Sequence, residues 1–253
     1  MSATEPETGE AARTILSTKA ALAALGQGEL ELGSLLPWGS NYTFLATIHH
    51  KDHLQFPVVY KPQRGERPLW DFPEGTLAKR EVAAYFVSEM LGWSFVPPTI
   101  LRDGPHGPGS VQLFIDFDPN HHYFNMSEEE KPCLHRVVLF DYLTNNADRK
   151  GGHIVLDPEE RLWLLDHGIC FHSEYKLRTV VWDFAGFPIP DAMQTELHSF
   201  KKKFEADAEF VPTLQELLSV REIGALQRRT NDLLEAGCFP NPGHCRNYPW
   251  PPL

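Results

Sequence analysis

Cysteine is scarce in this sequence, and long hydrophobic runs are missing from it. The four cysteines among 253 residues are scattered, which argues against a disulfide framework and favours a reducing, intracellular location. No apolar run approaches the roughly 20 residues that a membrane-spanning helix needs. The first residues are acidic and polar, unlike a secretory signal. We therefore expect a cytoplasmic protein without a transmembrane segment.

Basic residues are too few for a nucleic-acid-binding protein. The chain has 23 Lys and Arg against 34 Asp and Glu, a formal net charge of −11. Such a balance gives no bulk attraction to nucleic acid or to anionic lipid. We expect no nucleic-acid partner, while a local basic patch leaves peripheral contact with a membrane open.

Metal-ligating residues gather in sequence at two places, and both have an ordinary explanation. Cys238, His244 and Cys245 resemble half of a zinc site, but no second Cys/His pair lies nearby, so two reduced thiols are the favoured interpretation. The three histidines of residues 49–53 are better explained as the solvated tip of a β-hairpin.

The pattern of elements divides the chain into a β-rich first part and a helical second part. Residues 1–12 are typical of a disordered acidic tail, and residues 15–25 of a short helix ended by Gly26. β-branched and aromatic residues predict strands, and an apolar stripe predicts one helix. The strands are expected at residues 41–48, 56–62, 96–101 and 110–117, and the helix at residues 77–91.

Capping boxes mark helices in the second part. Ser127 with Glu130 predicts one helix start, and Ser219 with Glu222 predicts the start of another helix that ends at Gly237. Two short strands are expected between them, at residues 153–156 and 162–165. The sequence thus predicts an α+β, two-lobed fold. Its N-lobe would span residues 13–118 and its C-lobe residues 119–253.

Two polar segments carry the strongest functional signal. Residues 145–153 place Asp148 in a loop after an apolar helix, and residues 164–168 place Asp166 and a glycine directly after a hydrophobic strand. Upstream, Lys61 ends a strand and Glu81 lies early in a helix, where the two could pair. Phosphoryl transfer needs cations on the phosphates and a carboxylate that positions the attacking group.

Each of these four residues alone has a simple structural explanation. A strand-end lysine protects a sheet edge, a glutamate beside basic residues is ordinarily solvated, and both aspartates can form turns. The order strand-Lys, helix-Glu, loop-Asp, strand-Asp-x-Gly is much less common by chance. It favours a kinase-like enzyme in which Asp148 deprotonates the acceptor and Asp166 ligates Mg²⁺.

A turn before the first predicted strand is the candidate phosphate cover. In Gly39-Ser40-Asn41, backbone N–H groups and the Ser40 hydroxyl would contact the phosphates. A plain turn that needs a small residue explains the segment equally well. It is not a Walker A loop, because no Gly-Lys-Ser/Thr follows.

At this point the sequence resembles the phosphatidylinositol 3-/4-kinase-like family, including its actinobacterial members. The matching segments are residues 59–62, 80–85, 141–149 and 165–168. The resemblance implies a two-lobed protein-kinase-like fold with ATP in the cleft, Lys61 on the phosphates, Asp148 as catalytic base and Asp166 on the metal. It also implies that the segment Phe114, Ile115, Asp116 and Phe117 forms the hinge against the adenine.

One position departs from that family. Its members usually carry an asparagine, as a second Mg²⁺ ligand, five residues after the catalytic aspartate, and here that position is His153. Imidazole suits Mn²⁺ better than Mg²⁺. Few cations follow Asp166, so a protein or small-molecule hydroxyl fits as well as a lipid.

Three functional hypotheses follow from the sequence. The first is a phosphotransferase that uses ATP and Mg²⁺, or Mn²⁺, on an unknown hydroxyl acceptor. The second is a catalytically inactive pseudokinase that binds nucleotide as a scaffold or sensor, for which His153 is the best support. The third is a metal-dependent phosphohydrolase, suggested by 12 histidines but weakened by the lack of a helical His pair.

Overall fold

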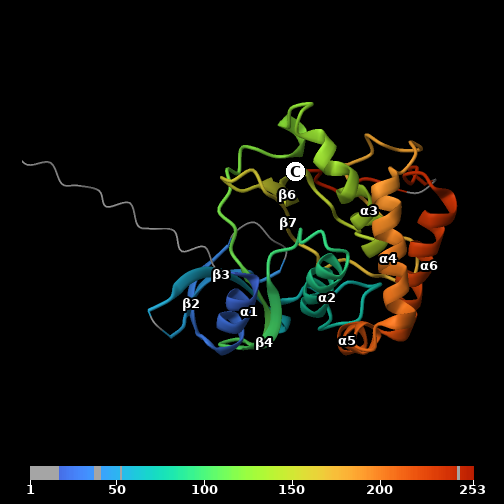
Figure 1. Cartoon of the computed structure of the whole chain (residues 1–253). Helices are drawn as coiled ribbons and strands as arrows, with labels where there is room; N and C mark the ends of the chain where they lie inside the picture. Colours follow the sequence, from blue (N-terminus) through green and yellow to red (C-terminus); the bar gives the residue numbers. More distant parts are fainter. Residues whose placement is uncertain (1–16, 37–40, 52, 244–245) are drawn as a thin grey trace, which may run out of the picture.

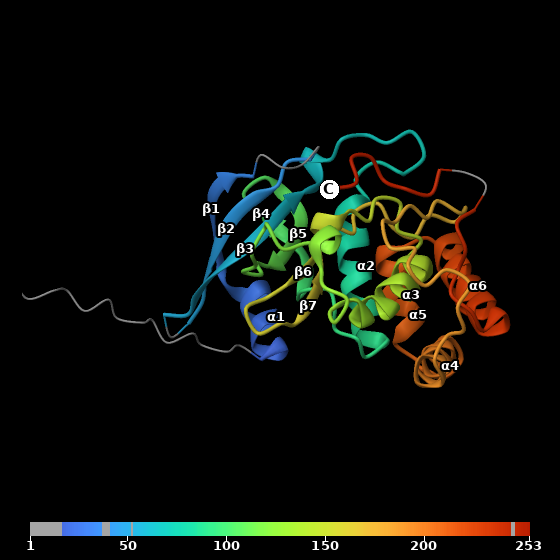
Figure 2. The ribbon, with the colours of Figure 1, turned by 90° about the horizontal axis from the view of Figure 1, so that it is seen from above.

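The protein places a β-sheet beside a group of helices, with one helix between them. A computed structural model describes residues 17–36, 41–51, 53–243 and 246–253. In Figure 1 the sheet and α1 (Thr18–Gln27) lie to one side of α2 (Leu77–Met90), and the later helices lie to the other. Figure 2 shows the same order from above. The predicted α+β class, with a β-rich first part and a helical second part, is confirmed.

Within the described residues, the first part contains one five-stranded antiparallel sheet in the order β1-β2-β3-β5-β4. Its strands are β1 (Glu29–Leu35), β2 (Phe44–His49), β3 (Gln55–Pro62), β4 (Thr99–Gly104) and β5 (Gly107–Leu113). Alternation along β3 sends Val58 and Tyr60 into a core shared with α1. Val59 and Lys61 therefore face the other way and line a cavity.

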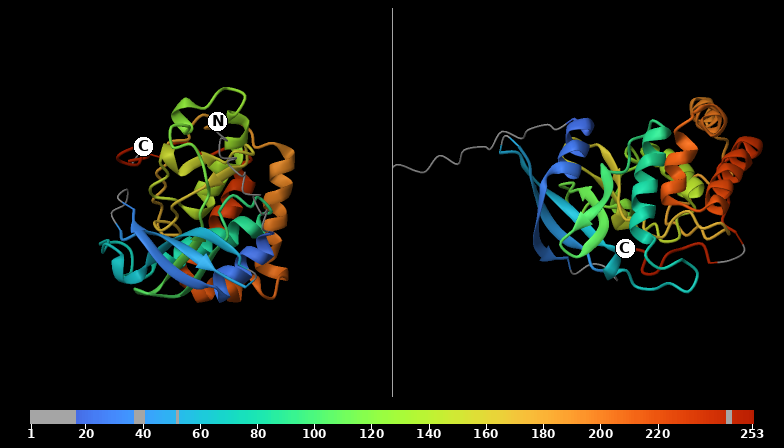
Figure 3. Two further views of the ribbon diagram at one scale, coloured as in Figure 1. Left: turned by 90° about the vertical axis from the view of Figure 1, so that its left-hand side faces the viewer. Right: turned by 90° about the horizontal axis from the view of Figure 1, so that it is seen from below.

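Helix α2 is buried on most of its sides, because it packs between the sheet and the later helices, as the right-hand view of Figure 3 shows. Besides apolar residues such as Ala83 and Val87, it buries two neighbouring charged residues, Arg80 and Glu81. The helix stops before Gly92, whose φ of +73° suits glycine. Buried charges need partners, and those of Arg80 and Glu81 define the site described below.

The second part has a large hydrophobic core surrounded by helices. They are α3 (Leu134–Thr144), α4 (Asp191–Ala206), α5 (Phe210–Leu217) and α6 (Val220–Ala236). A short antiparallel hairpin, β6 (Ile154–Leu156) and β7 (Leu162–Leu164), lies between α3 and α4 in the sequence. The capping box predicted at Ser219 and Glu222 does open α6, and Gly237 follows the helix with a φ of +60°.

The first elements of the chain differ from the prediction. Helix α1 runs to Gln27, so Gly26 lies inside it and Gly28 is its C-cap. Strand β1 was not predicted. Of its residues only Leu30 is buried. An edge strand with so little buried surface leaves a weak apolar pattern.

Two further boundaries are also corrected. The strand predicted to reach Phe117 ends at Leu113, and the helix predicted from Ser127 begins only at Leu134. Glu130 does accept the Ser127 N–H at 2.6 Å. However, Pro132 follows in a short 3₁₀ turn. A proline disfavours the α conformation at the residue before it.

Some predictions fall on parts of the chain that the structure does not describe. These are the acidic tail at residues 1–12, Ser40 of the phosphate-covering turn, and the His244-Cys245 half of the zinc hypothesis. Among the described helices, none has the length and apolar character needed to cross a membrane. The cytoplasmic location and the lobe boundary at residues 118 and 119 stay predictions.

Candidate active site

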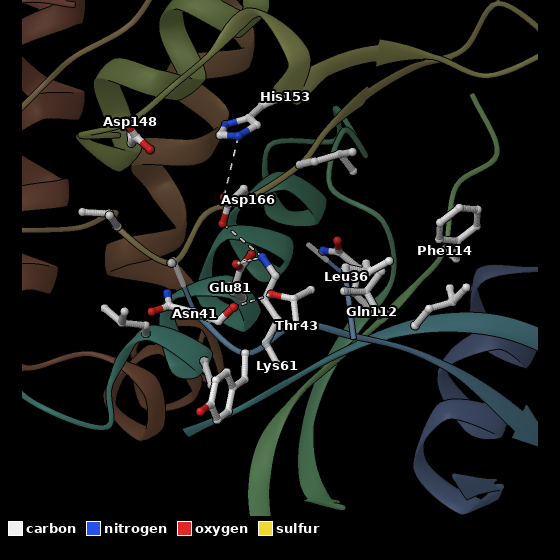
Figure 4. A pocket seen from close by; sticks show the side chains of 18 of the residues that line it. Leu36, Asn41, Thr43, Lys61, Glu81, Gln112, Phe114, Asp148, His153 and Asp166 are labelled. Carbon is white, nitrogen blue, oxygen red and sulfur yellow. Dashed lines mark hydrogen bonds and ion pairs between the residues drawn. The ribbon is translucent and has the colours of Figure 1, made fainter. Parts of the chain in front are cut away.

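A cavity of about 570 Å³ lies between the sheet and the second part of the chain. Its walls bring together residues that are far apart in the sequence (Figure 4). Strand β3 contributes Lys61, α2 contributes Glu81, and two loops of the second part contribute Asp148, His153 and Asp166. The four predicted catalytic and metal residues, together with Glu81, the predicted partner of Lys61, therefore line one cavity.

Lys61 lies between two carboxylates on the floor of the cavity. Its Nζ donates to Glu81 Oε1 at 2.5 Å and to Asp166 Oδ1 at 3.0 Å. Burial disfavours the charged ammonium, but attraction to Asp166 and Glu81 outweighs it and raises the pKa of Lys61. Conversely, Lys61 lowers the pKa of Asp166 well below its usual value. The lysine is thus a fixed cation facing the cavity.

The loop that carries Asp166 is held in an unusual backbone conformation. Asp166 has a φ of +57°, in the left-handed region that Asp and Asn adopt more readily than other non-glycine residues. The second oxygen of Glu81, Oε2, accepts the next backbone N–H, that of His167, at 2.9 Å. Glu81 therefore binds both Lys61 and the loop that presents Asp166.

Asp148 lies apart from Lys61 and Glu81, on the same side of the site as His153 (Figure 4). Its backbone N–H donates to Asn146 Oδ1 at 2.9 Å, and its carboxylate lies 3.7 Å from Lys150 Nζ. Burial raises the pKa of Asp148 to about 6, against the opposing attraction of Lys150. A carboxylate with that pKa is ionised at pH 7 and basic enough to accept a proton.

His153 faces Asp166 across a short gap. Its Nε2 lies 3.7 Å from Asp166 Oδ2, so the two predicted metal ligands are close together. Burial lowers the pKa of His153 to about 4, and the ring is therefore neutral at pH 7. A neutral imidazole and a carboxylate are both suitable metal ligands.

A buried network beneath the two loops was not predicted from the sequence. Arg149 is fully buried, and its guanidinium donates to Asp141 Oδ1 at 3.0 Å, to the Leu165 carbonyl at 2.8 Å and to His167 Nε2 at 2.7 Å. Thr179 Oγ donates to the other oxygen of Asp141 at 3.1 Å. The network joins the Asp148 loop to the Asp166 loop.

The candidate nucleotide-binding residues are only partly gathered in the cavity. Asn41 lines it, and its Oδ1 already accepts the Arg67 N–H at 2.7 Å. Phe114, Ile115 and Phe117 also line it, as expected of a hinge. Asp116, predicted in the same segment, is exposed and is not part of the described cavity wall.

Apolar side chains complete the cavity, and sequence reasoning had not assigned them to it. Leu45 and Val59 come from the sheet, and Leu165 and Ile169 from the Asp166 loop. Strand alternation was the available signal, since Val59 lies two residues before Lys61 and hence on the same face. Together these residues make part of the cavity wall apolar.

Comparison with known sequences finds a relative that matches along nearly the whole chain. Protein Rv2133c of Mycobacterium tuberculosis (strain ATCC 25618 / H37Rv) is 39% identical over 269 aligned positions, covering 90% of this chain and 94% of that protein. Phosphatidylinositol 4-kinase gamma 4 of Oryza sativa subsp. japonica is 33% identical over 129 positions. That match covers 43% of this chain but only 22% of the kinase. No family model matches.

Solved structures show the fold. The structure of hydra Fam20 with sugar has a TM-score of 0.54 at 14% identity and covers 87% of each chain. The Helicobacter pylori proinflammatory kinase CtkA has a TM-score of 0.53 at 10% identity, covering 85% of this chain and 94% of that one. At such identities the likeness shows a protein-kinase-like fold and nothing finer.

Proposed function

The chain belongs to the same family as Protein Rv2133c of Mycobacterium tuberculosis, and from that premise we propose that it transfers the γ-phosphate of ATP to a hydroxyl group. The observation that carries the proposal is the position of Lys61 between Glu81 and Asp166, with Asp148 lining the same cavity. Phosphoryl transfer depends on this kind of positioning and charge stabilisation.

Lys61 and Glu81 are assigned to phosphate binding. The ammonium of Lys61 supplies positive charge on the floor of the cavity, and Glu81 keeps the flexible lysine side chain extended. A lysine fixed in advance loses less conformational freedom when the phosphates bind. Apolar residues of the cavity wall such as Val59 and Phe114 would contact the adenine ring.

Asp166 and His153 are the residues that would hold a divalent cation, which when bound neutralises charge on the phosphates. Within the described residues, no three Asp, Glu, His or Cys side chains form a ready-made metal cluster. Mg²⁺ commonly binds through one or two carboxylates plus substrate phosphates, so this donor set fits a nucleotide-borne ion. It does not fit the phosphohydrolase hypothesis, which needs several converging protein ligands.

Asp148 is assigned as the base that orients the acceptor hydroxyl and takes its proton. Its carboxylate lines the cavity and forms a long ion pair with Lys150, whose Nζ lies 3.7 Å away. The partial likeness to phosphatidylinositol 4-kinases supports the phosphatidylinositol 3-/4-kinase-like type. An inositol lipid, a protein hydroxyl and a small-molecule hydroxyl are the acceptors to be screened.

Two substitutions test the assignment. We expect Asp148→Asn to lower the turnover of ATP by at least about 100-fold while ATP affinity stays within about twofold of the unchanged protein. Asp166→Asn should instead weaken ATP binding in the presence of metal. Isothermal titration calorimetry measures ATP binding and ADP formation measures turnover, and Asp103→Asn, an exposed change outside the cavity wall, serves as control. Normal turnover by both variants would contradict the proposal.

A second function, nucleotide binding without phosphoryl transfer, is favoured by His153. It stands where the family that the sequence resembles usually carries an asparagine as a second Mg²⁺ ligand. Its Nε2 lies 3.7 Å from Asp166 Oδ2. His153→Asn separates the two functions. If the histidine only alters metal preference, the variant will gain activity with Mg²⁺ relative to Mn²⁺. If the unchanged protein binds ATP but transfers phosphate to no acceptor with either metal, the scaffold or sensor function is supported.

A further inference from the structure

Arg80, the residue next to Glu81, connects α2 to the second part of the chain. Neighbouring helix residues point about 100° apart, so Glu81 faces the cavity while Arg80 faces α6. Its side chain is only 2% exposed, and its Nη2 donates to Glu222 Oε1 at 2.6 Å. Such a buried charge is held by its partner rather than by water.

Glu222 is itself fixed by the start of α6. Its Oε2 accepts the backbone N–H of Ser219 at 2.8 Å and the Ser219 hydroxyl at 2.7 Å. Helix α6 is 17 residues long and packs into the hydrophobic core through residues such as Leu226 and Leu233. The carboxylate therefore offers α2 a rigid anchor rather than a mobile surface partner.

Arg80 also binds the segment that follows Asp166. Its Nη1 donates to the carbonyl of Cys170 at 2.7 Å, while Glu81 accepts the N–H of His167 at 2.9 Å. Two consecutive residues of α2 thus contact one loop at points three residues apart. A displacement of α2 would break both contacts together with the bond from Glu81 to Lys61.

We propose that Arg80 and Glu222 form a clamp between α2 and α6 that fixes Glu81, and through it Lys61, in the position needed to bind phosphates. Neither Arg80 nor Glu222 touches the reacting atoms, so both are positioning residues. The inference rests on the proposed function. It also means that contacts within the chain hold α2 in its binding position.

The protein contains a matched pair that should lack this role. Arg136 donates to both oxygens of Glu196, at 3.0 and 2.7 Å, and joins α3 to α4. The two side chains are 37% and 30% exposed and lie outside the wall of the cavity. Both pairs link two helices through the same chemistry, but only the Arg80 pair involves α2.

The test compares Glu222→Gln with Glu196→Gln in the full chain. Glutamine still completes a capping box, so α6 should keep its start. We expect Glu222→Gln to weaken ATP binding in calorimetry about tenfold, or about 1.4 kcal/mol, and to speed amide hydrogen exchange in residues 77–84. Glu196→Gln should change neither quantity more than about twofold. Arg80→Lys, which keeps the charge, should recover part of the affinity lost on Arg80→Met.

A double-substitution cycle separates positioning from general destabilisation. If the clamp acts through Glu81, Glu222→Gln will have no further effect on ATP affinity in a Glu81→Gln background. An equal loss in both backgrounds, or unchanged affinity and exchange in Glu222→Gln, overturns the clamp. Failure of the unchanged protein to bind ATP would instead overturn the proposed function, and the exchange of α2 would still report whether the anchor exists.

Discussion

In two places an acidic residue of the cavity is a sequence neighbour of a buried arginine. Glu81 follows Arg80 on α2, and Asp148 precedes Arg149 in a loop of the second part. Both arginines reach the same loop: Arg80 binds the Cys170 carbonyl, and Arg149 binds the Leu165 carbonyl. They differ in their carboxylate partners. The Arg149–Asp141 pair is 0% exposed on both sides, whereas the Glu222 side chain that binds Arg80 is 12% exposed.

This difference suggests different roles for the two pairs. The Arg149–Asp141 pair stabilises the fold, and the Arg80–Glu222 pair positions residues of the site. Asp141 and Arg149 both belong to the second part of the chain, and they hold two of its loops together. Arg80 joins α2 to α6 and so connects the two parts of the protein. We therefore expect loss of Arg149 to lower stability most, and loss of the Arg80 contact to lower ligand affinity most.

The largest expected effect is on stability. Arg149→Met leaves the fully buried Asp141 without its cation, and an unpaired buried charge costs about 3–5 kcal/mol. Urea unfolding at pH 7 measures the change, with Arg136→Met as the control pair at the surface, where we expect about 1 kcal/mol or less. A loss of unfolding free energy below about 1 kcal/mol for Arg149→Met would show that Arg149 stabilises the fold no more than the surface residue Arg136, and would contradict the stability role given to Arg149.

The next effect concerns the acidic residue beside Arg149. Because burial raises the pKa of Asp148 to about 6, its carboxyl becomes protonated as the pH falls through 6 and then cannot accept a proton. We expect kcat/KM to decrease about tenfold per pH unit below 6 and to level off above it. A pH–rate profile with ATP affinity measured in parallel checks this. A flat profile between pH 5 and 7 would remove Asp148 from the role of base.

The smallest expected effect is the loss of a single hydrogen bond within the Arg149 network. Thr179→Val removes a hydroxyl that donates to Asp141 at 3.1 Å, while Arg149 continues to pair with that carboxylate. Loss of one such hydrogen bond should cost about 1 kcal/mol in unfolding free energy. Thr195→Val, at an exposed position on α4, should stay within about 0.5 kcal/mol. Equal losses at the two positions would argue against a tightly coupled network.

The sequence predicted the parts of the site that follow from local order. Lys61 ends a strand, Glu81 lies in the next helix, and the two aspartates follow apolar elements, so their sequence order anticipated their meeting. Arg80 was not predicted, because nothing local distinguishes a buried arginine from a solvated one. Its burial depends on α6, which begins about 140 residues later.

Glu222, the partner of Arg80, also has a role that could not be predicted from the local sequence. The capping box Ser219-Glu222 was predicted and is present, but a local motif uses only one oxygen of the glutamate. The other oxygen binds Arg80, and this long-range use leaves no trace in the spacing. Likewise, the Ser127 capping box kept its hydrogen bond and still did not start a helix, because Pro132 intervenes.

The positive φ of Asp166 limits how relatives of this protein can lose the residue. Most side chains pay about 1–2 kcal/mol in the left-handed region, whereas Asn and Gly are tolerated there. Asp166→Ala would therefore remove a charge and strain the loop at once, while Asp166→Asn removes only the charge. A descendant sequence that reads Asn-His-Gly at this loop can keep the shape of the whole molecule while giving up its acidic ligand. Loss of chemistry by that route is a single conservative step.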